Sequence, residues 1–435
     1  MHEKVITWAT PVFFALIAVE LAWGWRRGRT GYRLNDAITS LSLGAISQTA
    51  GVFTRVLRVG LYAAVFEHVA LVRWPAGAWW SLPAALLAYD FCYYWHHRWM
   101  HEIGVAWAAH VVHHSSEDYN LTTALRQTGT GALLGWIPYL PLAVAGVPPA
   151  LFGAVALIDL LYQFWIHTEA IGRLGWFDRV FASPSNHRVH HAVNDRYVDR
   201  NYGGLLIVWD RVFGTFQEER DDDPPVYGTR SPLRSFDPVR ANLEVYARLA
   251  RDSWRTRRWV DKLQVWVRRP GWQPPDLARE HPKPPFRMSD VRRYDPRVSA
   301  GAGAYALVQF VVALACSVHL LQVHARAGTL ESAAYLGWTV LSFVAVGGVL
   351  EARRAVLPVE VARLALAAGV VLATGRWFGT GALPPILQAA LCAAALASAA
   401  AAWRVTRAFP PARFGRTGTG DPAPIRHRSG DVKPN

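Results

Sequence analysis

Uncharged apolar runs of about twenty residues constrain this chain more than any other feature. Ala304–Val323 and Leu383–Trp403 contain no Asp, Glu, Lys or Arg. As helices, runs of this length match the hydrocarbon core of a bilayer, which is roughly 30 Å thick. Apolar residues make up 52% of the 435 residues and charged residues only 18%, and the chain holds 20 tryptophans, a residue enriched at membrane interfaces. We therefore predict an all-α integral membrane protein, a helical bundle with several spans.

The apolar segments also predict a topology. Nine spans are expected, at 5–25, 38–66, 78–95, 131–147, 150–166, 302–324, 333–350, 357–374 and 383–403. Positive charge next to membrane spans is typical of cytoplasmic loops. By this rule, five segments are cytoplasmic: the loop after the first span, the stretches 96–127, 168–300 and 351–354, and the C-terminal tail. It requires that the spans at 131–147 and 150–166 form a hairpin, and the first span is expected to be a retained helix rather than a signal peptide.

Composition divides the chain into five parts. We expect N-terminal membrane helices in 1–75, a histidine-rich catalytic domain in 76–220, a cytoplasmic amphipathic and linker region in 221–300, four further membrane helices in 301–405, and a disordered basic tail in 406–435. Within the third part, Asn242–Arg269 interleaves Leu, Trp and Val with many arginines. This pattern is typical of a helix on a membrane surface, although an ordinary surface helix would look the same.

The net charge of +14 does not indicate nucleic-acid binding. The arginines gather in short loops beside apolar segments, and no nucleic-acid recognition motif accompanies them. The three cysteines, Cys92, Cys316 and Cys392, lie far apart in apolar segments. We interpret them as packing residues, because neither a disulfide framework nor metal-type spacing is present.

Ten of the 16 histidines lie between positions 96 and 191. His97 and His101 are four residues apart, which on a helix puts both imidazoles on one face. The pattern His-x-x-His-His occurs at 110–114 and again at 187–191, and His167 follows the fifth expected span. Imidazole is a common ligand of iron, zinc and copper. We therefore predict a di-metal site in a cytoplasmic cap, with the ligands His97, His101, His110, His113, His114, His167, His187, His190 and His191.

Other side chains near these histidines are candidates for supporting roles. Glu102 and Asp90 could orient ligating imidazoles, and Asn120 could bind a ligand or substrate; each could equally have a structural role. His96 points away from the face of His97 and His101 and is expected to be structural. No nicotinamide or flavin motif occurs, so electrons for a redox reaction must come from an external donor.

Two other kinds of metal protein fit these residues less well. A zinc hydrolase of the His-Glu-x-x-His type would need a glutamate at position 98, where this chain has arginine. A non-catalytic membrane protein that binds or moves metal would need histidines along successive spans. The histidines instead cluster at one expected membrane face, which favours catalysis.

The histidine patterns resemble those of a known family. The segments 97–101, 110–114 and 187–191 are similar to the histidine boxes of the fatty acid hydroxylase / sterol desaturase superfamily, and the resemblance covers about residues 30–220. The runs 113–127, 162–169 and 201–216 more closely resemble the alkylglycerol monooxygenase branch of that superfamily. Asn186 departs from the family pattern, where histidine is expected in many members, and we expect little consequence because it lies outside the boxes.

This resemblance implies a membrane diiron monooxygenase. Its eight-histidine set maps onto the three boxes, with two iron ions as cofactors. The implied reaction is O2-dependent hydroxylation of the ether-linked carbon of an alkylglycerol, which releases a fatty aldehyde, with tetrahydrobiopterin as a possible electron donor. The implied partners are a lipid from the bilayer, O2 and the donor. Hydroxylation or desaturation of a sterol, hopanoid or fatty acyl chain is the alternative within the superfamily.

Overall fold

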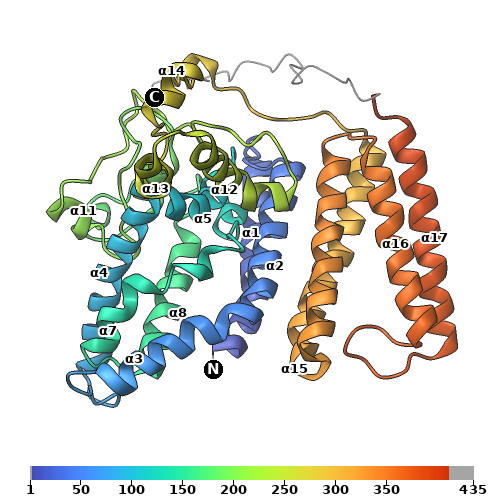
Figure 1. The fold of residues 1–435 in the computed structure, drawn as a ribbon, viewed down its shortest axis with the longest axis horizontal. Coiled ribbons are helices and arrows are strands. Elements are labelled where there is room, and N and C mark those ends of the chain that lie inside the picture. Colours follow the sequence, from blue (N-terminus) through green and yellow to red (C-terminus); the bar gives the residue numbers. More distant parts are fainter. Residues whose placement is uncertain (1, 411–435) are drawn as a thin grey trace.

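The computed structural model describes residues 2–410 and shows helices packed into two side-by-side groups (Figure 1). No β-strand is present within these residues, where only isolated bridges occur. The structure confirms the predicted all-α membrane fold. The predicted disordered tail from 406 onward lies outside the described residues after position 410.

The first group contains the N-terminal half of the chain. It contains α1 (His2–Arg26), α2 (Leu34–Arg55), α3 (Leu61–Val69), α4 (Ser81–Glu102) and α8 (Pro149–Trp165), and a π-helical turn at Val56–Gly60 joins α2 to α3. The expected spans at 5–25, 38–66, 78–95 and 150–166 fall on these helices. Short helices cover the end of the group where α4 stops: α5 (Gly104–His114), α6 (Leu121–Ala124), α9 (Phe177–Val180), α10 (Pro184–His191) and α11 (Val208–Val212).

The expected helical span at 131–147 is wrong. The chain does run back toward the start of α8 there, but as two 3₁₀ turns, Gly131–Leu133 and Ile137–Tyr139, followed by the short helix α7 (Leu140–Val144). Pro138 and Pro141 lack the backbone N–H that a helix needs and clash with the preceding turn, and Gly131 and Gly135 weaken the helix further. Apolar composition alone therefore did not specify a helix.

The second group holds the C-terminal membrane helices. Three helices in the described part of the chain are long and apolar enough to cross a membrane: α15 (Ala300–Leu350), α16 (Val356–Thr374) and α17 (Pro385–Arg407). The helix α15 folds back on itself at Gly328, where the backbone is not helical. His319 Nδ1 therefore lies 3.1 Å from the hydroxyl of Tyr335, although 16 residues would separate them by about 24 Å along a straight helix. The two limbs correspond to the expected spans at 302–324 and 333–350.

The expected amphipathic helix at 242–269 is two helices. They are α12 (Pro238–Arg255) and α13 (Trp259–Val267), and the chain then continues through α14 (Pro275–Glu280) and a 3₁₀ turn at Met288–Asp290 to α15. The break occurs where Asp276 accepts hydrogen bonds from the hydroxyl of Thr256 and the backbone N–H of Arg257. These bonds hold the chain in an extended conformation between the two helices.

Candidate metal centre

Four separate elements bring nine histidines together. The helix α4 contributes His97 and His101, and α5, which begins after a single extended residue, contributes three more. His167 follows the end of α8. The helix α10 supplies the last three; it begins at the N-cap Ser183, whose side chain accepts the N–H of Asn186, with Pro184 in its first turn.

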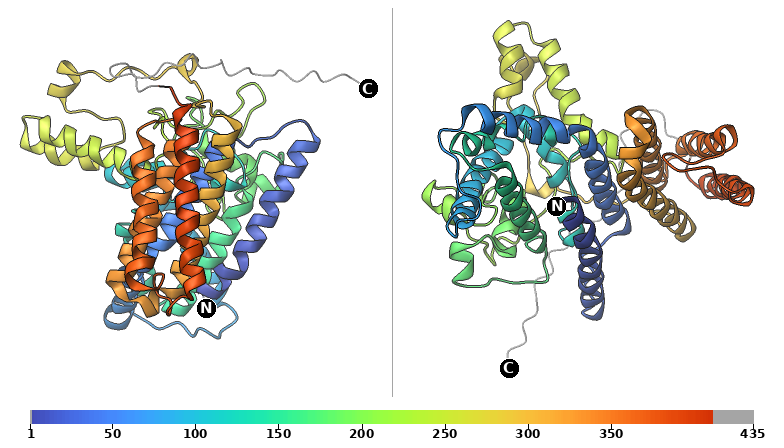
Figure 2. Two further views of the ribbon diagram at one scale, coloured as in Figure 1. Left: turned by 90° about the vertical axis from the view of Figure 1, so that its right-hand side faces the viewer. Right: turned by 90° about the horizontal axis from the view of Figure 1, so that it is seen from below.

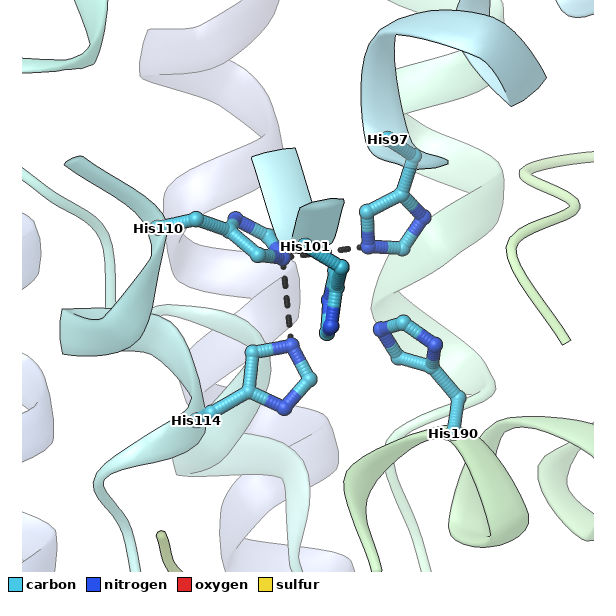
Figure 3. Close-up of side chains that lie close together, drawn as sticks. All are labelled: His97, His101, His110, His114 and His190. Atoms are coloured by element: carbon cyan, nitrogen blue, oxygen red, sulfur yellow. Dashed lines mark hydrogen bonds between the residues drawn. The ribbon is translucent and has the colours of Figure 1, made fainter. Parts of the chain in front are cut away.

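These histidines form two groups, each compact enough to hold one metal ion. Within a group the candidate ligand atoms all lie within 4.8 Å of one another. Group one consists of His97, His101, His110, His114 and His190, and group two of His113, His167, His187 and His191. Figure 3 shows the five rings of group one converging on a common centre. The structure thus brings together all nine histidines that the sequence predicted as ligands.

The nitrogen separations fit coordination to a metal. The Nε2 atom of His110 lies 3.1 Å from Nε2 of His97 and 3.1 Å from Nε2 of His114. In group two, Nε2 of His187 lies 3.0 Å from that of His167 and 3.2 Å from that of His191. Two nitrogens bound at right angles, each about 2.1 Å from one ion, would lie about 3.0 Å apart. The donor atoms are therefore already spaced as metal ligands.

Backbone carbonyls orient the rings. The Nδ1 atoms of four histidines lie within hydrogen-bonding distance of a carbonyl oxygen: His97 with Tyr202 at 2.8 Å, His113 with Arg126 at 3.0 Å, His167 with Gln163 at 2.7 Å and His190 with Arg200 at 3.0 Å. A carbonyl only accepts, so each Nδ1 must carry the proton. This tautomer leaves the lone pair of Nε2 pointing into the group, as a metal ligand requires.

Burial gives the histidines the charge state that metal binding needs. It lowers the pKa of His113 to about 4, against an opposing contribution from the hydrogen bond to Arg126. Burial also lowers the pKa of His110, His187 and His191 well below the usual value. These imidazoles are neutral at physiological pH. The buried Nε2 atoms of His101 and His190 have no hydrogen-bond partner, which a bound metal would supply.

The three residues predicted to support the site make their contacts with residues other than the nine histidines. Glu102 pairs with Arg98 and Arg269, each at 3.2 Å. Asp90 accepts hydrogen bonds from the N–H groups of Leu205 and Leu206 and from the indole of Trp209. It thereby holds the loop that supplies the carbonyl of Tyr202. Asn120 caps α6, and its amide also donates to the carbonyl of Gly31.

A carboxylate beside one of these histidines was missed from the sequence. Asp199 Oδ1 lies 3.6 Å from Nδ1 of His101, and its φ of 58° is in the left-handed region that Asp and Asn tolerate best. Nothing in the residue spacing distinguishes Asp199 from its neighbours, so only the folded chain reveals it.

Two residues set aside on sequence grounds lie outside both groups. His96 packs against Tyr139, whose hydroxyl is 3.3 Å from His96 Nδ1. Asn186 is buried and donates to the carbonyls of Asp178 and Phe181. It therefore fastens the start of α10 to the preceding loop.

Comparison with known proteins identifies the family. The model of the fatty acid hydroxylase family matches residues 82–215, which include all nine histidines. The chain is 35% identical to alkylglycerol monooxygenase of Xenopus tropicalis over 79% of this chain and 77% of that protein. It is 39% identical to the Homo sapiens enzyme of that name, over 71% and 69%, and 36% identical to that of Danio rerio, over 83% and 81%.

The chain belongs to the fatty acid hydroxylase family. Its relatives in this family are named monooxygenases and hydroxylases, so the chain is an oxidoreductase, a lipid monooxygenase by class. The family model covers ten histidines, and all of them except His96 are gathered by the fold into the two groups. No solved structure matches the chain.

Proposed function

We propose that groups one and two hold two iron ions and that the protein uses O2 to hydroxylate a lipid, most directly the ether-linked carbon of an alkylglycerol. Two adjacent groups of imidazoles whose candidate ligand atoms converge carry this proposal. The alkylglycerol substrate comes from the relatives, since those that align over most of this chain carry that name. Collapse of the hydroxylated ether would release a fatty aldehyde and glycerol. Bound iron would supply the activation of O2 and the oxidation of the C–H bond.

The chain itself orients the histidine rings for metal binding. The carbonyls of Tyr202, Arg126, Gln163 and Arg200 hold four of the ligand rings in one tautomer, so these rings need no rearrangement when iron binds. Eight of the nine histidines are buried, and His110 is only partly exposed. A site closed in this way excludes bulk water, which would otherwise quench a strong oxidant.

Two buried arginines fix elements around the histidine groups. Arg126 donates to the carbonyl of Val112 and to the hydroxyl of Ser40, and so fixes α5 against α2. Arg188 forms a two-pronged pair with Glu219, at 2.7 and 2.8 Å. It also donates to the carbonyls of Thr168 and Ile171, beside His167. Both arginines therefore have positioning roles.

We place the histidine groups at the cytoplasmic face. They lie near the end of the bundle at which α1 stops, and Arg26, Arg27 and Arg29 are at that end of α1. Positive residues beside membrane spans are retained in the cytoplasm. The lipid would enter from the bilayer with its polar head toward this face. The electron donor would come from the aqueous side, and tetrahydrobiopterin is the donor that we propose.

The test is aldehyde release. Membranes containing the protein are incubated with an alkylglycerol, O2 and tetrahydrobiopterin, and fatty aldehyde is measured for the unmodified chain, His114→Ala and His281→Ala. His281 is exposed and lies outside both groups, so it serves as a matched control. We expect aldehyde that requires the pterin, disappears with His114→Ala and persists with His281→Ala. Well-folded, iron-loaded protein that releases no aldehyde would reject the alkylglycerol assignment and direct the search to sterols, hopanoids and acyl chains.

A further inference from the structure

The helices α12 and α13 form an arm, Pro238–Val267, that projects sideways from the histidine-bearing group of helices (Figure 2). The arm is a well-formed hairpin. Asp237 caps α12 by accepting the N–H groups of Val239 and Arg240. Lys262 of α13 donates to the carbonyls of Ser253, Trp254 and Thr256 at 2.7 to 3.0 Å, which closes the C-terminal end of α12. What the arm exposes is therefore the surface of a folded element.

The helix α12 has three distinct faces. One face packs against α5 and its surroundings through buried residues, including Ala241 and Val245. The second is exposed and apolar, with residues spaced three or four apart: Val239, Leu243, Ala247, Ala250 and Trp254. The third carries charge at the same spacing: Arg240, Glu244, Arg248, Arg251 and Arg255. An ordinary surface helix needs only a buried face and a polar face, so the second apolar face is unexplained by the fold.

The helix α13 also exposes large apolar side chains. Trp259 and Leu263 are four residues apart, and their side chains are 82% and 74% exposed, compared with 87% for Trp254. Val267 follows one turn later and is also exposed. Large apolar side chains gathered on one element in this way mark a surface that binds another apolar phase.

Charge identifies that phase. The segment 238–269 has eight arginines and one lysine against three acidic residues. Such an excess opposes the pairing of two copies of the arm, because like charges would face each other. It favours binding to a surface in which an anionic layer covers an apolar layer. The interface of a bilayer with anionic headgroups is such a surface.

The position of the arm agrees with this assignment. Figure 2 shows the arm nearly perpendicular to the long helices and near one end of them, where a bilayer surface would lie. The arm is also attached firmly. The N–H of Gly104 donates to the carbonyl of Arg268 at 2.9 Å, and a Cβ at Gly104 would lie 3.0 Å from the carbonyl oxygen of Val265. Glycine is needed for this close approach of α5 to the end of α13.

We propose that the arm lies in the interface of an anionic leaflet, with Trp254, Trp259 and Leu263 at the acyl boundary and the arginines at the lipid phosphates. This interaction is separate from the proposed reaction, because it involves none of the histidine groups and makes no assumption about the lipid that is oxidised.

Photocrosslinking in the full-length chain tests the proposal. A benzophenone amino acid is placed at position 254 or 263 on the apolar face, or at position 244 on the charged face as the matched control. Position 396 of α17, a membrane helix in which Leu396 is 73% exposed, provides the positive control. The protein is reconstituted in nanodiscs of equal parts phosphatidylcholine and phosphatidylglycerol, irradiated, and the adducts are identified by mass spectrometry.

We expect lipid adducts at 254, 263 and 396, with at least about twofold fewer at 244. Among the adducts at 254, we expect the ratio of phosphatidylglycerol to phosphatidylcholine to exceed the ratio of these lipids in the disc by at least about twofold. Replacement of Arg251, Arg255 and Arg258 by Gln should remove this excess, while lipid adducts at 254 remain. Adducts at 254 to a second copy of the chain, or none at 254 while 396 reacts with lipid, would overturn the proposal. Phosphatidylglycerol at 254 at only its share of the disc would overturn the anionic assignment.

Discussion

The imidazole rings of His114 and His191 stack with their centroids 4.3 Å apart and their planes 22° apart. His114 belongs to group one and His191 to group two, so this contact is one of those that join the two candidate metal sites. The two rings come from α5 and α10, and His114 and His191 are 77 residues apart in sequence. The relative placement of two metal ions would therefore depend on the packing of these two helices.

His167 is predicted to be as essential as the histidines of the three boxes. Its Nε2 lies 3.2 Å from that of His113 and 3.0 Å from that of His187, inside group two. His167→Ala should lower lipid oxidation by more than about 100-fold, beyond the usual effect of losing a residue that only orients a ligand. Product formation at saturating substrate measures this loss. Near-normal turnover by the folded variant would show that His167 is not a ligand.

Asp199 is predicted to position His101. Asp199→Asn keeps the shape and tolerates the positive φ, but removes the negative charge 3.6 Å from Nδ1 of His101. Iron affinity should fall by about 10-fold with little change in thermal unfolding. Asp195→Asn is the matched control, because Asp195 pairs with Arg230 at an exposed position. Equal iron affinity of the two variants, measured by competition with a chelator, would argue against this role.

The pair between Arg188 and Glu219 is predicted to stabilise the fold around α10. Both side chains are nearly buried, so Glu219→Ala would leave an unpaired guanidinium charge beside group two. Removing one partner of a buried pair costs about 3–5 kcal/mol of the free energy of unfolding.

Asp222→Ala provides the comparison for this pair. Asp222 pairs with Arg220 at the surface of the same loop region, and its loss should leave the unfolding temperature unchanged. Thermal unfolding in detergent measures both variants. A Glu219→Ala protein as stable as the Asp222→Ala protein would contradict the account.

Gly328 is predicted to permit the fold-back of α15. Its φ of 75° and ψ of 170° lie in a region that is essentially restricted to glycine. A Cβ there would meet no atom within 4 Å, so Gly328→Ala tests the backbone alone, with an expected cost of about 1–3 kcal/mol in the free energy of unfolding.

Gly337→Ala isolates the backbone effect. Gly337 lies in the second limb of the same helix, where a Cβ would likewise meet nothing, but its φ is negative. Alanine should stabilise the helix at this position by up to about 1 kcal/mol. If both substitutions shift the unfolding temperature in the same direction, Gly328 is not a strained position.

The sequence predicted which histidines come together, because their spacing follows the helical repeat. His97 and His101 share a face of α4, and the His-x-x-His-His patterns place their rings on one side of α5 and α10. The sequence did not predict the backbone carbonyls that orient these rings. Carbonyls such as those of Tyr202 and Arg200 belong to irregular loops, and their direction depends on distant contacts, among them the hydrogen bonds of Asp90 to the loop at 205–209.

The sequence predicted some of the membrane helices correctly and others incorrectly. Apolar length located α15, α16 and α17 correctly, because a helix is the only regular structure that satisfies its own backbone in lipid. At 131–147 the same composition gave a wrong result, since Pro138 and Pro141 break the helix. The single expected helix at 242–269 is two for a different reason, because the break depends on Asp276, which lies outside that segment.

Iron content per chain tests the central claim most directly. The full-length protein is purified in detergent after expression with iron, and bound iron is measured by mass spectrometry against protein concentration. The account predicts two iron ions per chain, with reduced occupancy in both His114→Ala and His187→Ala and no change in His281→Ala. An active protein that binds no iron, or that keeps its full iron content when His114 and His187 are both replaced, would contradict it.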